Sequence, residues 1–93
     1  MTLAAHSSWE DLRDLARQGA VALVPVGSTE AHGPHLPLDT DVVIAQEVAA
    51  RAQTLLEEAG RPAVIFPALA YGVTDFAQGF AGTVSISAST LEA

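Results

Sequence analysis

The chain has 93 residues, a formal net charge of −7 and a composition that is 49% hydrophobic and 16% charged. This length allows one domain at most, and the aliphatic composition is typical of a globular chain. The four basic residues, all arginine, form no basic stripe, which argues against nucleic acid and against an anionic membrane surface as partners. The sequence has no lysine, which excludes a Walker A loop and a Schiff-base lysine, and no cysteine, so any metal must be held by nitrogen and oxygen.

The start of the chain carries no targeting signal that we can recognise. Residues 1–6 lack the basic start and the long apolar stretch of a signal peptide, and no apolar run in the sequence reaches membrane-spanning length. We therefore expect a cytoplasmic protein.

The first expected element is a short helix between Ser7 and Gly19. Ser7 with Glu10 has the capping-box spacing, and Gly19 suits the C-terminal end. Trp9 lies on the apolar side of this helix, and we expect it to anchor the core.

A strand–helix–strand unit is expected next. Residues 20–26 and 62–66 are apolar without alternation, which predicts strands buried on both faces, as in a parallel sheet. A helix should run between them from about 41 to 59, and residues 83–87 alternate as a third strand would. The pattern predicts an α/β fold with a mainly parallel sheet.

The long helix has signals at both ends and an apolar stripe. Thr40 can cap it, and Asp41 in its first turn is favoured by the helix dipole. The apolar side chains that share one stripe, and that we expect to face the core, are Ile44, Val48, Leu55 and Leu56.

The loop between the first strand and this helix carries the chemistry. Two of the three histidines of the chain lie in it, and its acids and histidines are Glu30, His32, His35, Asp39 and Asp41. Carboxylate oxygen and imidazole nitrogen at this density are what a zinc, manganese or iron site needs. The residues alone leave a second interpretation open, in which this is a proline-rich surface loop with solvated acids and a capping Asp41.

The spacing of these residues would allow their side chains to converge. Glu30 and His32 are two residues apart, so an extended segment would point both to one side. The chain then turns, and Asp41, at the start of the helix, would come back to the same place. The loop leaves the carboxyl end of the first strand, where ligands bind in open parallel sheets, and residues 71–82 leave the same end of the second strand.

The run over residues 27–38, Gly-Ser-Thr-Glu-Ala-His-Gly-Pro-His-Leu-Pro-Leu, is followed by Thr-Asp at 40–41. It resembles the signature of the creatininase family of metal-dependent amidohydrolases. A weaker likeness extends over residues 8–10, 71–72 and 80–83. The resemblance implies a three-layer α/β/α fold with a mainly parallel sheet, incomplete in this chain, so that residues 1–93 would be a single partial domain, the N-terminal part.

The resemblance also implies a two-metal centre, with zinc favoured and manganese or iron as alternatives. Glu30 would bind one metal, His32 the other, and Asp41 would bridge the two. His35 matches a family position that orients a ligand or touches substrate, which makes it a candidate catalytic residue together with Glu30, a candidate base. Asp39 lies where the family varies, and a solvated acid is favoured there.

The implied activity is hydrolysis of a cyclic amide, formamide or peptide-type C–N bond by metal-activated water. Relatives act on creatinine, on formamide intermediates of cofactor synthesis and on a peptide precursor of mycofactocin, and the sequence does not choose among these amide substrates. The resemblance further implies a homo-oligomer, usually a homohexamer.

Two departures from the family pattern leave alternatives open. Relatives take a further histidine and glutamate ligand from a later glycine-rich motif, and Ser89 with Glu92 has the spacing of a helix start, so we expect a missing C-terminal half. Ala77 and Ala81 replace a histidine and a proline of the family. One alternative is therefore a non-catalytic fragment or split-subunit module that binds a partner and retains the metal loop. Another is a small α/β module that binds an organic ligand without metal.

Overall fold

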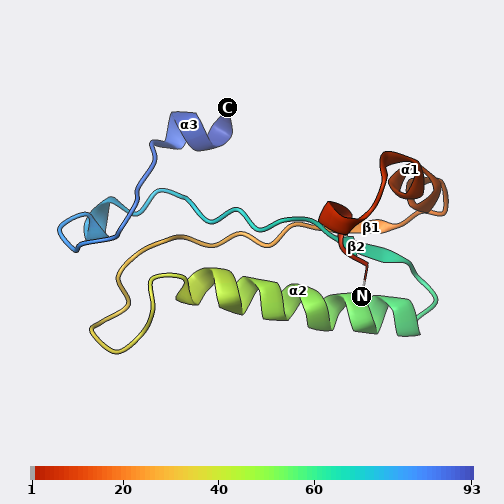
Figure 1. Cartoon of the computed structure of the whole chain (residues 1–93), viewed down its shortest axis with the longest axis horizontal. Helices are drawn as coiled ribbons and strands as arrows, with labels where there is room; N and C mark the ends of the chain where they lie inside the picture. Colours follow the sequence, from red (N-terminus) through yellow and green to blue (C-terminus); the bar gives the residue numbers. More distant parts are fainter. Residues whose placement is uncertain (1) are drawn as a thin grey trace. The chain divides into compact units, whose positions relative to one another are not determined.

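The computed structural model of the protein describes residues 2–93. Contacts divide the chain into two compact units. The first unit contains the chain up to Pro25 and Gln46–Pro67, and the second contains Val26–Ala45 and Ala68–Ala93. Figure 1 colours the elements along the chain, in which the long helix α2 follows β1 and precedes β2.

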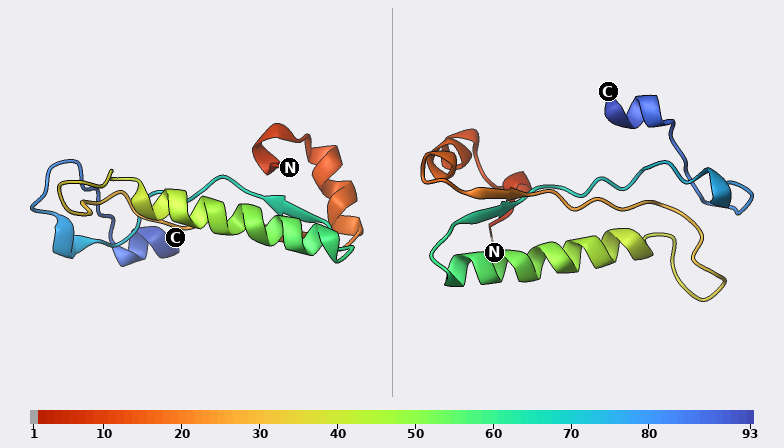
Figure 2. Two further views of the ribbon diagram at one scale, coloured as in Figure 1. Left: turned by 90° about the horizontal axis from the view of Figure 1, so that it is seen from below. Right: turned by 180° about the vertical axis from the view of Figure 1, so that it is seen from behind.

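The first unit is built on a small parallel sheet. Within residues 2–93, β1 (Val21–Leu23) and β2 (Ala63–Ile65) form a two-stranded sheet in which Val21 pairs with Ala63 and Leu23 with Ile65. The right-hand view of Figure 2 shows the two strands side by side. The predicted strand–helix–strand unit with a parallel sheet is confirmed, and so is the α/β class. The paired part of the first strand ends before Pro25, which has no N–H group to donate to a ladder.

The core of this unit lies around β2, whose residues are all buried. The N-terminal segment adds one parallel bridge, Leu3 with Ile65, and the Ile65 N–H group donates to the Thr2 carbonyl over 3.2 Å. Gln53 of α2 reaches the same place: its Nε2 donates to the Thr2 carbonyl over 2.8 Å and to the Ala63 carbonyl over 2.9 Å. One buried amide thus joins the helix, the strand and the N-terminal segment.

Helix α1 (Trp9–Arg17) begins one residue later than expected. Its N-cap is Ser8, which forms a capping box with Asp11. The predicted box of Ser7 with Glu10 is wrong, because the Ser7 hydroxyl instead donates to the Leu3 carbonyl over 2.8 Å and closes the preceding 3-10 turn, η1 (Ala4–His6).

Trp9 does not anchor the core within the described chain. Its side chain is 71% exposed, and the Arg13 guanidinium lies 5.1 Å from the centroid of its ring. That distance is within cation–π range, so the exposed indole has a partner on its own helix.

Helix α2 (Thr40–Glu58) has nearly the predicted bounds, but the predicted core face is wrong. Three of the four stripe residues, Ile44, Val48 and Leu55, are exposed, whereas Ala49 and Gln53 are buried. Small Ala49 and hydrogen-bonded Gln53 lie four residues apart, so they share one face of the helix. The first unit therefore buries the face of α2 that carries a small residue and a side chain hydrogen-bonded to β2.

The second unit is held by single bridges. Its bridges join Val26 to Leu69, Thr29 to Val84 and Gly72 to Ser85. In the part of the chain that the structure describes, the predicted third strand over residues 83–87 does not form, since Val84 and Ser85 each bridge a different segment.

Two short helices complete the second unit. They are η2 (Asp75–Ala77) and α3 (Ala88–Glu92), and the N-cap of α3 is Ser87, two residues before the predicted Ser89. The Ser87 hydroxyl accepts from the Thr90 N–H group over 3.1 Å. Across residues 2–93, no helix combines the length and the apolar character needed to cross a bilayer.

The Gln53 amide generates the first testable prediction. Gln53→Leu keeps most of the side-chain volume and removes both donated hydrogen bonds, so two carbonyls lose a partner. We expect the free energy of unfolding to fall by about 1–3 kcal/mol. Urea unfolding with an unchanged m-value measures this. The control is Thr54→Ala, which removes an exposed hydroxyl from the same helix. Equal stability of the Gln53 variant and the control would contradict the prediction.

Candidate metal centre

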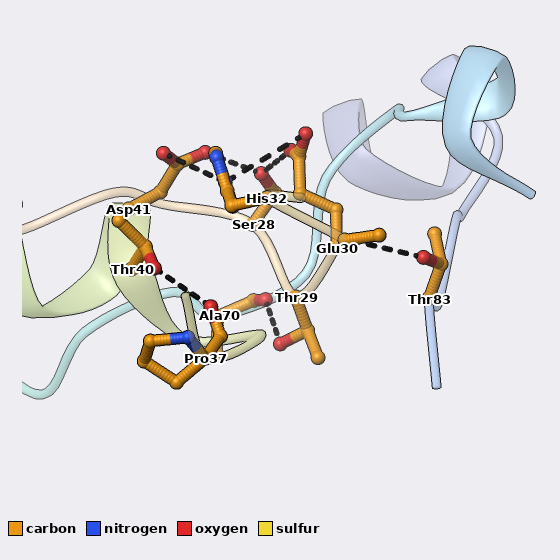
Figure 3. Close-up of polar contacts among 10 residues, drawn as sticks. Ser28, Thr29, Glu30, His32, Pro37, Thr40, Asp41, Ala70 and Thr83 are labelled. Atoms are coloured by element: carbon orange, nitrogen blue, oxygen red, sulfur yellow. Dashed lines mark hydrogen bonds and ion pairs between the residues drawn. The ribbon is translucent and has the colours of Figure 1, made fainter. Parts of the chain in front are cut away.

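An extended segment presents Glu30 and His32. The Thr29 carbonyl accepts from the Val84 N–H group over 3.0 Å, and the Thr29 hydroxyl donates to the Ala70 carbonyl over 2.8 Å. Two residues further on, the Ala31 N–H group donates to the Thr83 hydroxyl over 3.1 Å. Figure 3 shows the hydrogen bonds to Ala70 and Thr83.

A tight turn then reverses the chain. His32 forms an antiparallel bridge with Leu36, and Gly33 between them has a φ of +69°, which glycine adopts without strain. The Glu30 N–H group donates to the Leu38 carbonyl over 3.1 Å. The segment that follows the turn therefore leads directly into the first turn of α2, where Asp41 lies.

Gly27 allows this first turn to come close. A Cβ atom at Gly27 would lie 2.7 Å from the backbone nitrogen of Val42 and 2.9 Å from the carbonyl carbon of Asp41. These neighbours are backbone atoms, so a side chain could fit only if the helix start moved. The Gly27 N–H group also donates to the Leu69 carbonyl over 2.8 Å, which holds Gly27 in place.

Three donors converge as a result. Glu30, His32 and Asp41 each offer one ligand atom, and these atoms all lie within 4.8 Å of one another. His32 Nε2 is 3.2 Å from Asp41 Oδ1 and 3.9 Å from Glu30 Oε2. Figure 3 shows the imidazole between the two carboxylates. Glu30 is buried, whereas His32 and Asp41 are partly exposed, so the group is open on one side.

The chemistry of this donor set fits a divalent cation. His32 Nε2 is buried and has no hydrogen-bond partner among residues 2–93, although two carboxylate oxygens lie near it. A buried polar atom without a partner is costly, and a coordinated cation would satisfy it together with both carboxylates. Nitrogen and carboxylate oxygen suit zinc and manganese.

Ser28 is a polar neighbour to which the sequence reasoning gave no role in the metal site. Its hydroxyl donates to Glu30 Oε1 and also lies 2.8 Å from Asp41 Oδ2. Its spacing was a usable signal, because Ser28 and Glu30 are two residues apart and an extended segment points such residues to the same side.

The other polar residues of the loop lie outside the donor group. His35 and Asp39 are exposed, and neither belongs to the set of converging donors. The role of His35 in substrate contact stays a prediction. Thr40 is the first residue of α2, and its hydroxyl donates to the Pro37 carbonyl over 2.7 Å, so the expectation that Thr40 caps the helix is wrong.

An apolar hollow lies beside the turn of the loop. Its volume is about 260 Å³, and its lining residues are Ala31, Gly33, Pro34 and Phe80. Two of them, Ala31 and Gly33, flank His32 in the sequence, and all four lie in the second unit.

Comparisons with known proteins agree with the fold and the loop. The family model described as "Creatinine amidohydrolase" matches residues 5–93. A mycofactocin precursor peptide peptidase of Mycolicibacterium smegmatis (strain ATCC 700084 / mc(2)155) is 52% identical over 84 residues, which are 86% of this chain and 33% of that protein. A mutant creatininase of Zn-Zn type superposes with a TM-score of 0.79 at 28% identity, over 96% of this chain and 35% of that one. The structure called "Creatininase Mn" superposes with a TM-score of 0.78 at 27% identity, over 97% of this chain and 35% of that one.

The fold and the converging donors define an α/β chain of the creatininase type with a candidate centre for a divalent metal. The chain belongs to the creatininase family, and the resemblance found in residues 27–41 is confirmed. It spans about a third of the length of the curated relatives it matches.

The approach of Gly27 to α2 generates a prediction about the donors. Gly27→Ala must displace the first turn of α2, and Asp41 with it. We expect the affinity of the donor group for zinc to fall by about 10–100-fold, the usual effect of losing a contact that positions a metal ligand. Gly79→Ala is the control, since nothing lies within 4 Å of a Cβ atom there. Wild-type zinc affinity in the Gly27 variant would contradict the proposed constraint.

Proposed function

We propose that this chain carries metal ligands of a metal-dependent amidohydrolase that cleaves a C–N bond of amide type. The observation that carries the proposal is the convergence of Glu30, His32 and Asp41 within 4.8 Å. Two further facts support it: His32 Nε2 is buried without a hydrogen-bond partner in the described chain, and the chain belongs to the creatininase family.

Among the candidate bonds we favour the peptide type over a cyclic amide or a formamide. The peptidase relative is 52% identical, whereas the creatininases compared by structure are 27% and 28% identical.

In the proposed centre Glu30 would hold one metal and His32 another, and Asp41 would serve as a ligand of both. Zinc is favoured and manganese is the alternative, because relatives of both forms have this fold. A bound metal would polarise the scissile carbonyl and activate the attacking water. The remaining histidine and glutamate ligands are proposed to come from polypeptide outside residues 1–93.

The residues of the loop have separate tasks in this proposal. Glu30 and Asp41 supply the negative charge that holds the cation, and the bridge of His32 with Leu36 holds the backbone of the imidazole ligand. His35 is exposed at the turn, where it can contact substrate. A cytoplasmic homohexamer is part of the same proposal.

One observation favours a second candidate, a module that binds another polypeptide. Large apolar side chains are exposed in both units, among them Trp9, Leu55, Phe76 and Phe80. Exposed apolar surface beyond isolated residues is typical of interaction sites.

Removal of the imidazole tests the leading proposal. His32→Ala in the whole protein should release metal and lower turnover by more than 100-fold, a larger loss than partners outside the ligand set cause, which is about 10–100-fold. Metal per subunit is measured by elemental analysis after purification without chelator. Turnover is measured on creatinine and on a synthetic peptide amide.

Two other histidines are matched controls. His6→Ala should change neither quantity, because His6 is exposed and lies in the other unit. His35→Ala should keep the metal and alter KM or kcat. Unchanged turnover in His32→Ala with metal retained would reject the proposal.

The second candidate has its own test. If the exposed apolar side chains serve association, residues 1–93 expressed alone should sediment as a species larger than the 9.6 kDa chain. Phe76→Ser with Leu55→Ser, two exposed positions in different units, should shift the distribution toward monomer. A monodisperse monomer of the wild-type chain would rule this candidate out.

A further inference from the structure

We propose that Ser28 is a positioning residue, which orients the two carboxylates of the metal centre so that one oxygen of each faces the imidazole. This inference rests on the proposed function, since it concerns the same donors. Ser28 is part of the second unit, as are the three donors, and Figure 3 shows it between Glu30 and Asp41.

The contacts of Ser28 divide the four carboxylate oxygens into two pairs. The Ser28 hydroxyl contacts Glu30 Oε1 and Asp41 Oδ2. The other two oxygens, Glu30 Oε2 and Asp41 Oδ1, are those that lie 3.9 Å and 3.2 Å from His32 Nε2. Each carboxylate therefore turns one oxygen to the hydroxyl and the other to the imidazole, on the side where the proposed metals would be held.

Electrostatics explain why such a tether matters. Two carboxylates that meet at one point repel each other, and the repulsion is strong where burial lowers the local dielectric. The Ser28 hydroxyl has one proton and donates it to one carboxylate at a time, in a charge-assisted hydrogen bond. It keeps the two groups near each other before a cation arrives.

Asp41 depends on this tether more than Glu30 does. The Asp41 side chain is 37% exposed, whereas that of Glu30 is 9% exposed. A buried side chain is oriented by its surroundings, but a half-exposed one keeps rotamer freedom unless a specific contact removes it. Ser28 lies 13 residues before Asp41 in the chain, so the contact also ties the loop to the start of α2.

The same contacts argue against Ser28 as a nucleophile. Its hydroxyl is engaged by both carboxylates, and no histidine base contacts it in the part of the chain described. The sequence around it also lacks the glycine-flanked elbow of a nucleophilic serine. The contacts of the hydroxyl with Glu30 and Asp41 are those that a positioning role requires.

The experiment compares zinc affinity of three variants of the whole protein, by competition with a chromophoric chelator. Ser28→Ala should bind zinc about 10–100-fold more weakly, the usual effect of losing a hydrogen bond to a ligand. Ser28→Thr keeps the hydroxyl and should restore most of the affinity. Ser85→Ala is the matched control, because it makes the same substitution in the same unit and removes a hydroxyl that donates to another carboxylate, Asp75 Oδ1, over 2.6 Å.

Thermal unfolding of the metal-free variants separates positioning from folding. We expect Ser28→Ala and Ser85→Ala to unfold at similar temperatures while only the first loses zinc affinity. Wild-type affinity in Ser28→Ala overturns the inference, and so does an equal loss in Ser85→Ala or a folded Ser28→Thr that stays weak. A wild-type protein that binds no zinc or manganese would instead refute the proposed function itself.

Discussion

The close approach of Gly27 to the start of α2 is the constraint on which the site depends. A Cβ atom at this position would be 2.7 Å from the Val42 nitrogen, so the loop and the helix can meet only where the side chain is a hydrogen atom. The meeting places Ser28 within 2.8 Å of Asp41. Without that approach, the residues of the extended segment and the helix would remain separate, and no donor group would form.

The second requirement is an extended backbone between Ser28 and His32. Two threonine hydroxyls hold this backbone: that of Thr29 donates to the Ala70 carbonyl, and that of Thr83 accepts from the Ala31 N–H group. These side chains do not belong to the donor group, and they act on the backbone alone. Their effect is to align alternate residues of the segment on the side where Asp41 lies.

Local sequence patterns located the elements well and their details less well. The bounds of α2 and the parallel pairing of β1 with β2 followed from apolar runs and helix signals, which depend on neighbours in the chain. The helix caps were displaced by one or two residues because neighbouring serines are alternative caps: the Ser7 hydroxyl donates to the Leu3 carbonyl, and Ser8 accepts from the Asp11 N–H group. The buried face of α2 was mistaken because Gln53 finds hydrogen-bond acceptors on β2 that no local pattern reveals.

By itself the sequence determined the family and the α/β class, and it predicted the donors, because a dense run of glutamate, histidine and aspartate is visible without a fold. The tertiary structure decided that Glu30, His32 and Asp41 converge, that His35 does not join them, and that Ser28 contacts both carboxylates. The physical reason is that convergence depends on hydrogen bonds between segments far apart in the chain. Composition and residue spacing do not reveal those hydrogen bonds.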